Sequence, residues 1–111
     1  MPTVYELENE AEKLKDEGKY DEAIARLKQA LEIDESFVRA HLALAVVYQK
    51  AKNYEESVKH AVRACELEPD EPFNYTALSV TYQRAFAGTQ DHNYIRLAEE
   101  AMAKAHMLQN R

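Results

Sequence analysis

The sequence repeats at an interval of 34 residues, and this period constrains the fold more than any other feature. When the chain is shifted by one period, Tyr20 falls on Tyr54 and Glu22 falls on Glu56. Further matches in the same register are Ala30 with Ala64, Glu32 with Glu66, Leu44 with Leu78, Val46 with Val80, Tyr48 with Tyr82, and Gln49 with Gln83. A fixed period of this length is typical of an array of helical hairpins.

The composition is that of a small globular protein. The chain has 111 residues, of which 46% are hydrophobic and 31% are charged, so it can bury one modest core. Its net charge of −6 disfavours nucleic acid or an anionic membrane surface as a partner. The single cysteine cannot form an internal disulfide, and the first residues do not have the pattern of a signal peptide. We therefore expect a cytoplasmic protein.

Helix boundaries can be placed from capping residues and helix breakers. Thr3 and Glu6 have the spacing of a capping box, and Gly18 interrupts the first apolar stripe. Pro69 and Pro72 end one helix and begin another, because proline suits only a first helical turn. The predicted helices are residues 3–17, 20–34, 37–50, 54–67, 71–85 and 93–108. Helices this short are not stable alone in water, so each must pack its apolar stripe on its neighbours.

These features predict an all-α fold in which residues 1–111 form one domain. We expect six antiparallel helices, arranged as three helix-turn-helix repeats in a right-handed solenoid. The expected repeats are residues 4–37, 38–71 and 72–111.

The pattern resembles the tetratricopeptide repeat (TPR) family, which has characteristic small and large residues at fixed positions of each hairpin. Glu35 and Lys52 depart from the pattern, because they stand where the family usually has proline and a turn glycine. The matching residues are Leu7, Ala11, Leu14, Gly18, Tyr20, Ala23, Leu27 and Ala30 in the first repeat, His41, Leu44, Ala45, Tyr48, Tyr54, Ser57, Ala61, Ala64 and Pro69 in the second, and Tyr75, Leu78, Ser79 and Tyr82 in the third.

The third repeat contains an insertion. Tyr48 and Ser57 are 9 residues apart, whereas the equivalent Tyr82 and Ala98 are 16 apart, which leaves seven extra residues. We expect them within residues 86–93 as a loop between the last two helices. Such a loop is either a tolerated surface insertion or part of a binding edge.

The resemblance implies a concave groove lined by the first helix of each repeat. The groove residues are expected to be Tyr5, Glu8, Glu12, Arg39, Leu42, Val46, Lys50, Phe73, Val80 and Arg84. Leu42, Val46 and Val80 form an apolar centre, which is either a contact surface or an ordinary half-buried one. We expect Glu8 and Glu12 at one end of the groove, with Arg39, Lys50 and Arg84 at the other.

The family's well-known clamp for a peptide's terminal carboxylate is absent. Its Lys, Asn and Arg positions are occupied here by Glu8, Glu12, Ala43, Phe73 and Ala77. Two of these side chains are anionic and would repel a carboxylate. We therefore expect a non-enzymatic scaffold for protein–protein interaction, whose partner is a protein or peptide that is apolar with a basic end.

Two alternatives belong to other functional classes. Apolar residues near the C-terminus could join copies of the chain into a homo-oligomer, and the candidates are Leu97, Met102, Met107 and Leu108. An enzyme is disfavoured, because the sequence has no glycine-rich phosphate loop and no histidine pair four residues apart on one helix. His41 and Cys65 occupy packing positions, so we expect both to be structural. No cofactor or metal is expected.

Overall fold

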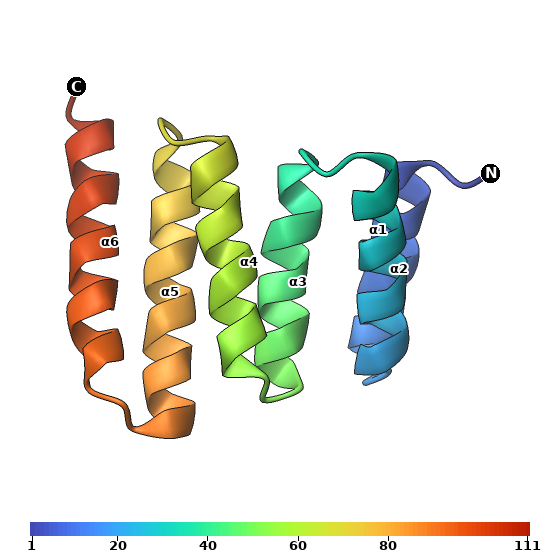
Figure 1. The fold of residues 1–111 in the computed structure, drawn as a ribbon, viewed down its shortest axis with the longest axis horizontal. Helices are drawn as coiled ribbons and strands as arrows, with labels where there is room; N and C mark the ends of the chain where they lie inside the picture. The colour runs from blue at the N-terminus through green and yellow to red at the C-terminus, as the bar shows by residue number, and fades with distance from the viewer.

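The computed structural model describes residues 1–111, and all of its regular secondary structure is helical (Figure 1). The helices are α1 (Val4–Asp16), α2 (Tyr20–Ile33), α3 (Val38–Lys50), α4 (Tyr54–Leu67), α5 (Pro72–Thr89) and α6 (Asn93–Gln109). The predicted all-α class is confirmed, and only the end of α5 differs from its predicted position by more than two residues. None of the helices combines the length and the apolar character that crossing a bilayer would require.

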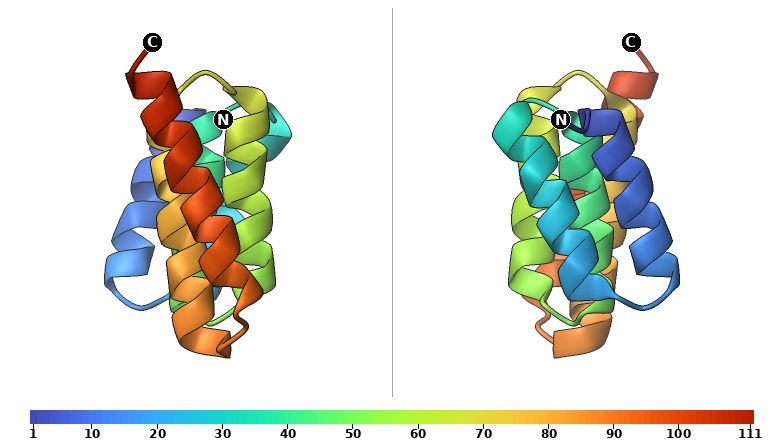
Figure 2. Two further views of the ribbon diagram at one scale, coloured as in Figure 1. Left: turned by 90° about the vertical axis from the view of Figure 1, so that its left-hand side faces the viewer. Right: turned by 90° about the vertical axis from the view of Figure 1, so that its right-hand side faces the viewer.

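The helices form three hairpins that follow one another along the long axis of the molecule (Figure 1). Figure 2 looks along this axis and shows α1 and α5 on one side, with α2 and α4 on the other. Each helix packs most extensively on its partner in the hairpin, and α3 and α5 also pack on the second helix of the preceding hairpin. The molecule is therefore a short helical repeat solenoid.

Two hydrophobic clusters connect the hairpins. The first contains Leu7, Leu27 and Leu44, which are almost completely buried between the first and second hairpins. The second contains Leu78 and Tyr82, which pack on α4 and α6. Small residues throughout both clusters let the helix axes come close together, and they are mostly alanines.

Two buried serines make equivalent hydrogen bonds, one between the two helices of the second hairpin and one between those of the third. Ser57 Oγ donates a hydrogen bond to the Ala45 carbonyl at 2.6 Å, and Ser79 Oγ donates one to the Ala98 carbonyl at 2.8 Å. Ser79 lies one period after Ala45, so the serine of the third hairpin stands on the first helix rather than the second. Its bonded partner Ala98 is the equivalent of Ser57, which agrees with an insertion of seven residues in the third repeat. These bonds satisfy hydroxyl groups that would otherwise be costly to bury.

The expectation that the insertion forms a loop is wrong, because most of it extends α5. The helix continues to Thr89 and ends at Gln90, which is left-handed (φ 62°) and donates its N–H to the Phe86 carbonyl at 2.7 Å. Gly88 lies against the Tyr54 ring, where an added Cβ would be 2.1 Å from Tyr54 Cζ. The extra turn is thus packed on the start of α4, and only residues 90–92 connect α5 to α6.

Candidate functional site

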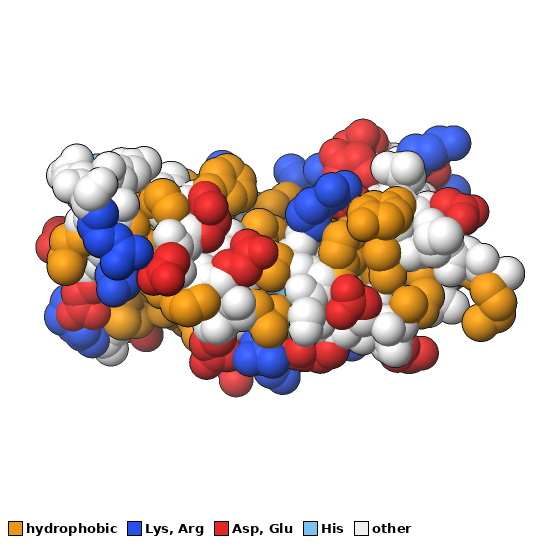
Figure 3. Space-filling model, turned by 90° about the horizontal axis from the view of Figure 1, so that it is seen from above, with side chains coloured by type: hydrophobic (Ala, Val, Ile, Leu, Met, Phe, Trp, Pro, Cys, Tyr) orange, Lys and Arg blue, Asp and Glu red, His pale blue; other side chains and the backbone are white.

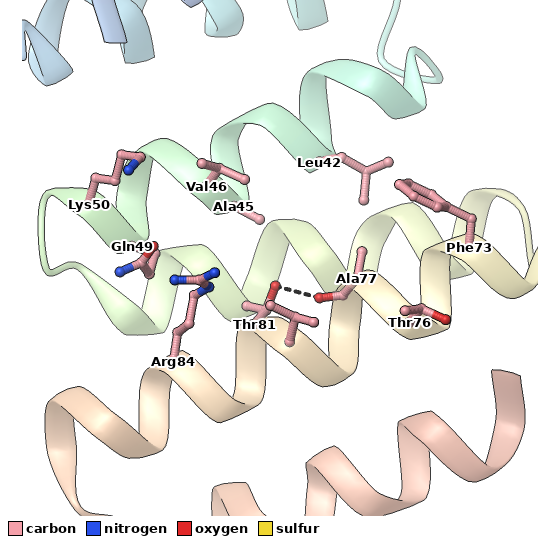
Figure 4. Close-up of a pocket in the computed structure, with 11 residues that line it drawn as sticks. Leu42, Ala45, Val46, Gln49, Lys50, Phe73, Thr76, Ala77, Thr81 and Arg84 are labelled. Atoms are coloured by element: carbon pink, nitrogen blue, oxygen red, sulfur yellow. Dashed lines mark hydrogen bonds between the residues drawn. The ribbon is translucent and has the colours of Figure 1, made fainter. Parts of the chain in front are cut away.

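A groove runs between α3 and α5 and encloses about 390 Å³, within the range of known ligand sites. Figure 4 shows the side chains that α3 and α5 contribute to it. The lining residues are Leu42, Ala45, Val46, Gln49, Lys50, Phe73, Thr76, Ala77, Val80, Thr81 and Arg84. Six of the ten predicted groove residues are among them. We call this site the α3–α5 groove.

The middle of the α3–α5 groove is apolar and open to solvent. Val46 is 44% exposed, Phe73 63% and Val80 37%, although their helix neighbours Ala45 and Leu78 are buried. Figure 4 shows Leu42 and Phe73 directed toward one another. These large apolar side chains on two adjacent helices form one apolar patch rather than single scattered exposures.

One end of the groove is basic. Lys50 lies in the last turn of α3, and Arg84 lies one period later on α5. Both side chains line the groove beside Gln49, and neither has a carboxylate within 4 Å. Their charges are therefore free to bind an anionic group.

The opposite end is acidic, and sequence reasoning missed it. A second hollow joins the first through Leu42 and Phe73, and it is lined by Asp34, Glu68 and Glu71. None of these three carboxylates has a cationic side chain within 4 Å. Figure 3 views the end of the molecule where the α2–α3 and α4–α5 loops lie, and it shows acidic side chains among hydrophobic ones.

Glu8 and Glu12, the predicted acidic end, do not line the α3–α5 groove, and both carboxylates are paired. Glu8 accepts two hydrogen bonds from Arg39, and the bond between Arg39 Nε and Glu8 Oε2 is 2.9 Å long. Glu12 binds Lys15 at 2.9 Å. Glu8 and Glu12 line a smaller hollow of about 90 Å³ between α1 and α3.

Arg39 does not lie at the basic end as expected. Its guanidinium is 5.8 Å from the centre of the Tyr5 ring and 5.6 Å from that of Phe37, and it lines the acidic hollow. The rings of Tyr5 and Phe37 meet edge to face at 5.7 Å. Tyr5 is therefore beside the α3–α5 groove in a separate aromatic cluster, in which Arg39 is neutralised by Glu8.

The four residues proposed for self-association do not form one patch. Leu97 packs against the second core cluster, whereas Met102 lies on the other flank of α6 and lines a hollow with Phe86. Met107 is 65% exposed and lies on the side of α6 opposite the buried Ala98, which is nine residues earlier on a helix of 3.6 residues per turn. Leu108 is half-buried on the same flank as Leu97.

A buried histidine pair connects α3 to α4, and sequence reasoning also missed it. His41 Nδ1 and His60 Nδ1 are 3.0 Å apart, and His41 Nε2 is 3.0 Å from the Glu35 carbonyl. A carbonyl can only accept, so His41 Nε2 carries a proton and His41 Nδ1 accepts from His60. His60 also stacks on Tyr48 at 5.7 Å.

His60 is arranged to stay neutral. Burial and, to a smaller extent, the neighbouring His41 lower the pKa of His60 to about 4, whereas Glu56 opposes the shift. A second proton would place two N–H groups against each other between the rings. The pair is thus structural at neutral pH, as expected for His41 alone.

Cys65 is buried as expected, with Sγ 3.4 Å from the Asn74 carbonyl, and burial raises the pKa of its thiol to about 11. No group of three or more His, Cys, Asp or Glu side chains has the arrangement of a metal site. Free charges and exposed apolar side chains are found together at the α3–α5 groove and the acidic hollow beside it.

Comparisons with known proteins agree with the helical repeat. A family model described as TPR repeat matches residues 11–52, and one described as tetratricopeptide repeat matches residues 38–71. No curated protein sequence matches the chain. The crystal structure of MamA is similar with a TM-score of 0.80 and 13% identity over 97% of this chain, which spans 59% of that chain.

Two further solved structures are similar over nearly their whole length. The second TPR of Spaghetti (RPAP3), bound to the HSP90 peptide SRMEEVD, has a TM-score of 0.75 and 20% identity, covering 96% of this chain and 92% of that one. The first TPR of the same protein, bound to the same peptide, has a TM-score of 0.66 and 16% identity, covering 98% and 94%. At these identities, the likeness shows the fold.

Proposed function

Because the chain belongs to the tetratricopeptide repeat family, we propose that it is a non-enzymatic protein-interaction scaffold that binds a segment of another protein in the α3–α5 groove. The observation that carries this proposal is the set of exposed apolar side chains across two helices, Val46, Phe73 and Val80, with unpaired charges at both ends. The peptide complexes of the two Spaghetti domains support a peptide or protein as the partner.

The proposed segment is apolar and has a basic end. Completing the burial of the side chains in the middle of the groove would contribute about 1 kcal/mol each, because each is already partly covered. The three carboxylates of the acidic hollow favour a cation at that end. Since association costs several kcal/mol of lost freedom, we expect a moderate affinity.

The groove differs from a clamp for a terminal carboxylate. Ala43 and Ala77 provide no donor at two of the five clamp positions, and Phe73 provides an exposed ring at a third. Glu8 and Glu12 are anionic at the remaining two. The chemistry of this site therefore favours burial of side chains over capture of a chain terminus.

The double variant Val46→Glu/Val80→Glu tests the proposal. Val46 is 44% and Val80 37% exposed, so we expect the helix content and the melting temperature to change little. Crosslinking from a cell extract should lose the specific partner, because two carboxylates would be buried in an apolar contact. The matched control is Ile33→Glu/Met107→Glu, which alters two exposed apolar residues outside the groove.

The proposal fails if the control variant loses the same partner, or if the groove variant retains it. Unfolding of the groove variant would also contradict it, because Val46 and Val80 would then belong to the core.

The second candidate function is self-association through α6. Met102 occupies in the third hairpin the position that Ala61 has in the second, where Ala61 is buried in the second core cluster. Met102 instead lines a hollow of about 360 Å³ with Ile95 and Phe86. Sedimentation of wild type and of Met102→Glu over a range of concentrations tests this alternative. A monomer at all concentrations would exclude the homo-oligomer.

A further inference from the structure

We infer that the α3–α5 groove has a fixed electrostatic polarity and selects a short extended segment with a cation at one end, apolar side chains in the middle and an anion at the other end. This inference rests on the proposed function and specifies the chemistry of the partner. It adds an anionic group to the expected apolar segment with a basic end, and it assigns each charge to a place in the groove.

The charges at both ends come from the repeat itself. Asp34 and Glu68 are one period apart at the acidic end, and Lys50 and Arg84 are one period apart at the basic end. Each pair therefore occupies equivalent places on successive hairpins, one on either side of the groove. The two ends carry opposite charge, although the whole chain has a net charge of −6.

Arg39 lines the acidic hollow but is neutralised by Glu8, and Lys15 outside the groove is bound to Glu12. The three carboxylates of the acidic hollow and the two cations of the basic end have no such partner. An oriented segment would supply the missing partners of the free charges. Such complementarity fixes the register and direction of a bound chain more than it raises the affinity.

Helix capping explains only part of this charge pattern. The Asp34 carboxylate accepts from the Ser36 N–H at 3.0 Å, and that of Glu71 accepts from the Phe73 N–H at 3.2 Å. Each of these bonds uses a single oxygen, so the other remains free. Arg84 is not in the last turn of α5, and capping therefore does not account for its position in the groove.

The dimensions fit an extended segment of six or seven residues between the charges. α3 has 13 residues, so the two ends are about 20 Å apart, which an extended chain spans in about six residues. Leu42, Val46 and Lys50 follow one another at about 6 Å along α3. Alternate side chains of an extended chain have nearly the same spacing, so each can contact one helical turn.

Four peptides test the polarity directly. Each has the same apolar core of six alternating leucines and serines, blocked termini, and two charged residues at each end. Two are dipolar, with lysines first and glutamates last or the reverse, and the others carry only lysines or only glutamates. By fluorescence anisotropy at low salt, we expect at least one dipolar peptide to bind about tenfold more tightly than either like-charged peptide, with the difference reduced at high salt.

Charge reversal in the groove gives a second readout. Lys50→Glu/Arg84→Glu makes both ends acidic, so the preference should move to the peptide with lysines at both ends. The matched control is Lys13→Glu/Lys52→Glu, which makes the same change in net charge at exposed positions outside the groove. Circular dichroism of each variant verifies that the fold is retained. The neutral variant Lys50→Gln/Arg84→Gln should only remove the discrimination against the lysine-only peptide.

The outcomes separate this inference from the proposed function. If all four peptides bind equally well, the groove binds apolar segments without polarity, and the inference is overturned while the proposed function stands. If only the lysine-only peptide binds, the basic end has no role and the inference is likewise overturned. If none of the four peptides binds, both are overturned.

Discussion

The histidine pair between α3 and α4 should make the fold sensitive to mild acid. Burial beside His41 lowers the pKa of His60 from an ordinary 6.5 to about 4. As the pH falls below 6.5, the unfolded chain takes up a proton at this position before the folded chain does. The free energy of unfolding therefore falls with pH from about 6.5 down to about 4, and this contribution is constant below that range.

The size of the effect follows from the two pKa values. Between pH 7 and pH 5, the difference in proton binding destabilises the fold by about 2 kcal/mol. For a chain of this length, this corresponds to a fall in melting temperature of about 10 °C. The His60 side chain is 14% exposed, so screening by solvent reduces this value only in part.

The assay compares thermal melts of wild type and His60→Gln at pH 7 and pH 5. The glutamine keeps a donor toward His41 but cannot be charged, so the variant should lose most of the acid-dependent fall. The matched control is His106→Gln, which removes an exposed histidine from α6. Equal falls in melting temperature for wild type and His60→Gln would refute the reasoning, because His60 would then bind protons equally in both states.

Two further predictions concern backbone positions. Gly88→Ala should lower the free energy of unfolding by about 1–3 kcal/mol in denaturant titrations, because the added Cβ would overlap the Tyr54 ring. The additional change Tyr54→Leu should restore part of this loss. Lys52→Gly should raise the free energy of unfolding by about 1 kcal/mol, because Lys52 has a φ of 65° that glycine adopts without strain; an unchanged or lower value would contradict this reasoning.

The helices and the position of the groove could be predicted because both follow from periodicity. One period places Leu42, Val46 and Lys50 on α3 at positions equivalent to Thr76, Val80 and Arg84 on α5. If the first helices of two hairpins are adjacent, these residues must face the same side. The structure places all six at one groove.

The pairing of the charges could not be predicted from the period. Glu8 binds Arg39 on the next first helix, which lies about one turn before Leu42, the equivalent of Glu8 one period later. The acidic end was missed because Asp34, Glu68 and Glu71 lie outside the helices whose faces were considered. The spacing of Asp34 and Glu68 by one period was nevertheless a usable signal.

The histidine pair was missed because only spacings within one helix were considered. In an antiparallel hairpin, each step forward along the second helix is matched by a step back along the first. Ser57 contacts Ala45, so His60 comes opposite the turn that contains His41. This geometry was accessible once the hairpin and one contact within it were known.

The extension of α5 depended on tertiary structure. Gly88 and the polar residues after it indicate a loop when only local propensity is considered. The helix continues because the Tyr54 ring packs on it at the glycine, and a larger side chain there would prevent this contact. Here packing overrides the local preference.

We propose that the α3–α5 groove holds a segment of another protein, and nuclear magnetic resonance of the labelled protein during titration with the dipolar peptides would locate the binding site. We expect the amide signals that shift to belong to residues 42–50 and 73–84, together with those near Asp34 and Glu68. Shifts confined to α6, or no shifts with any of the peptides, would contradict it.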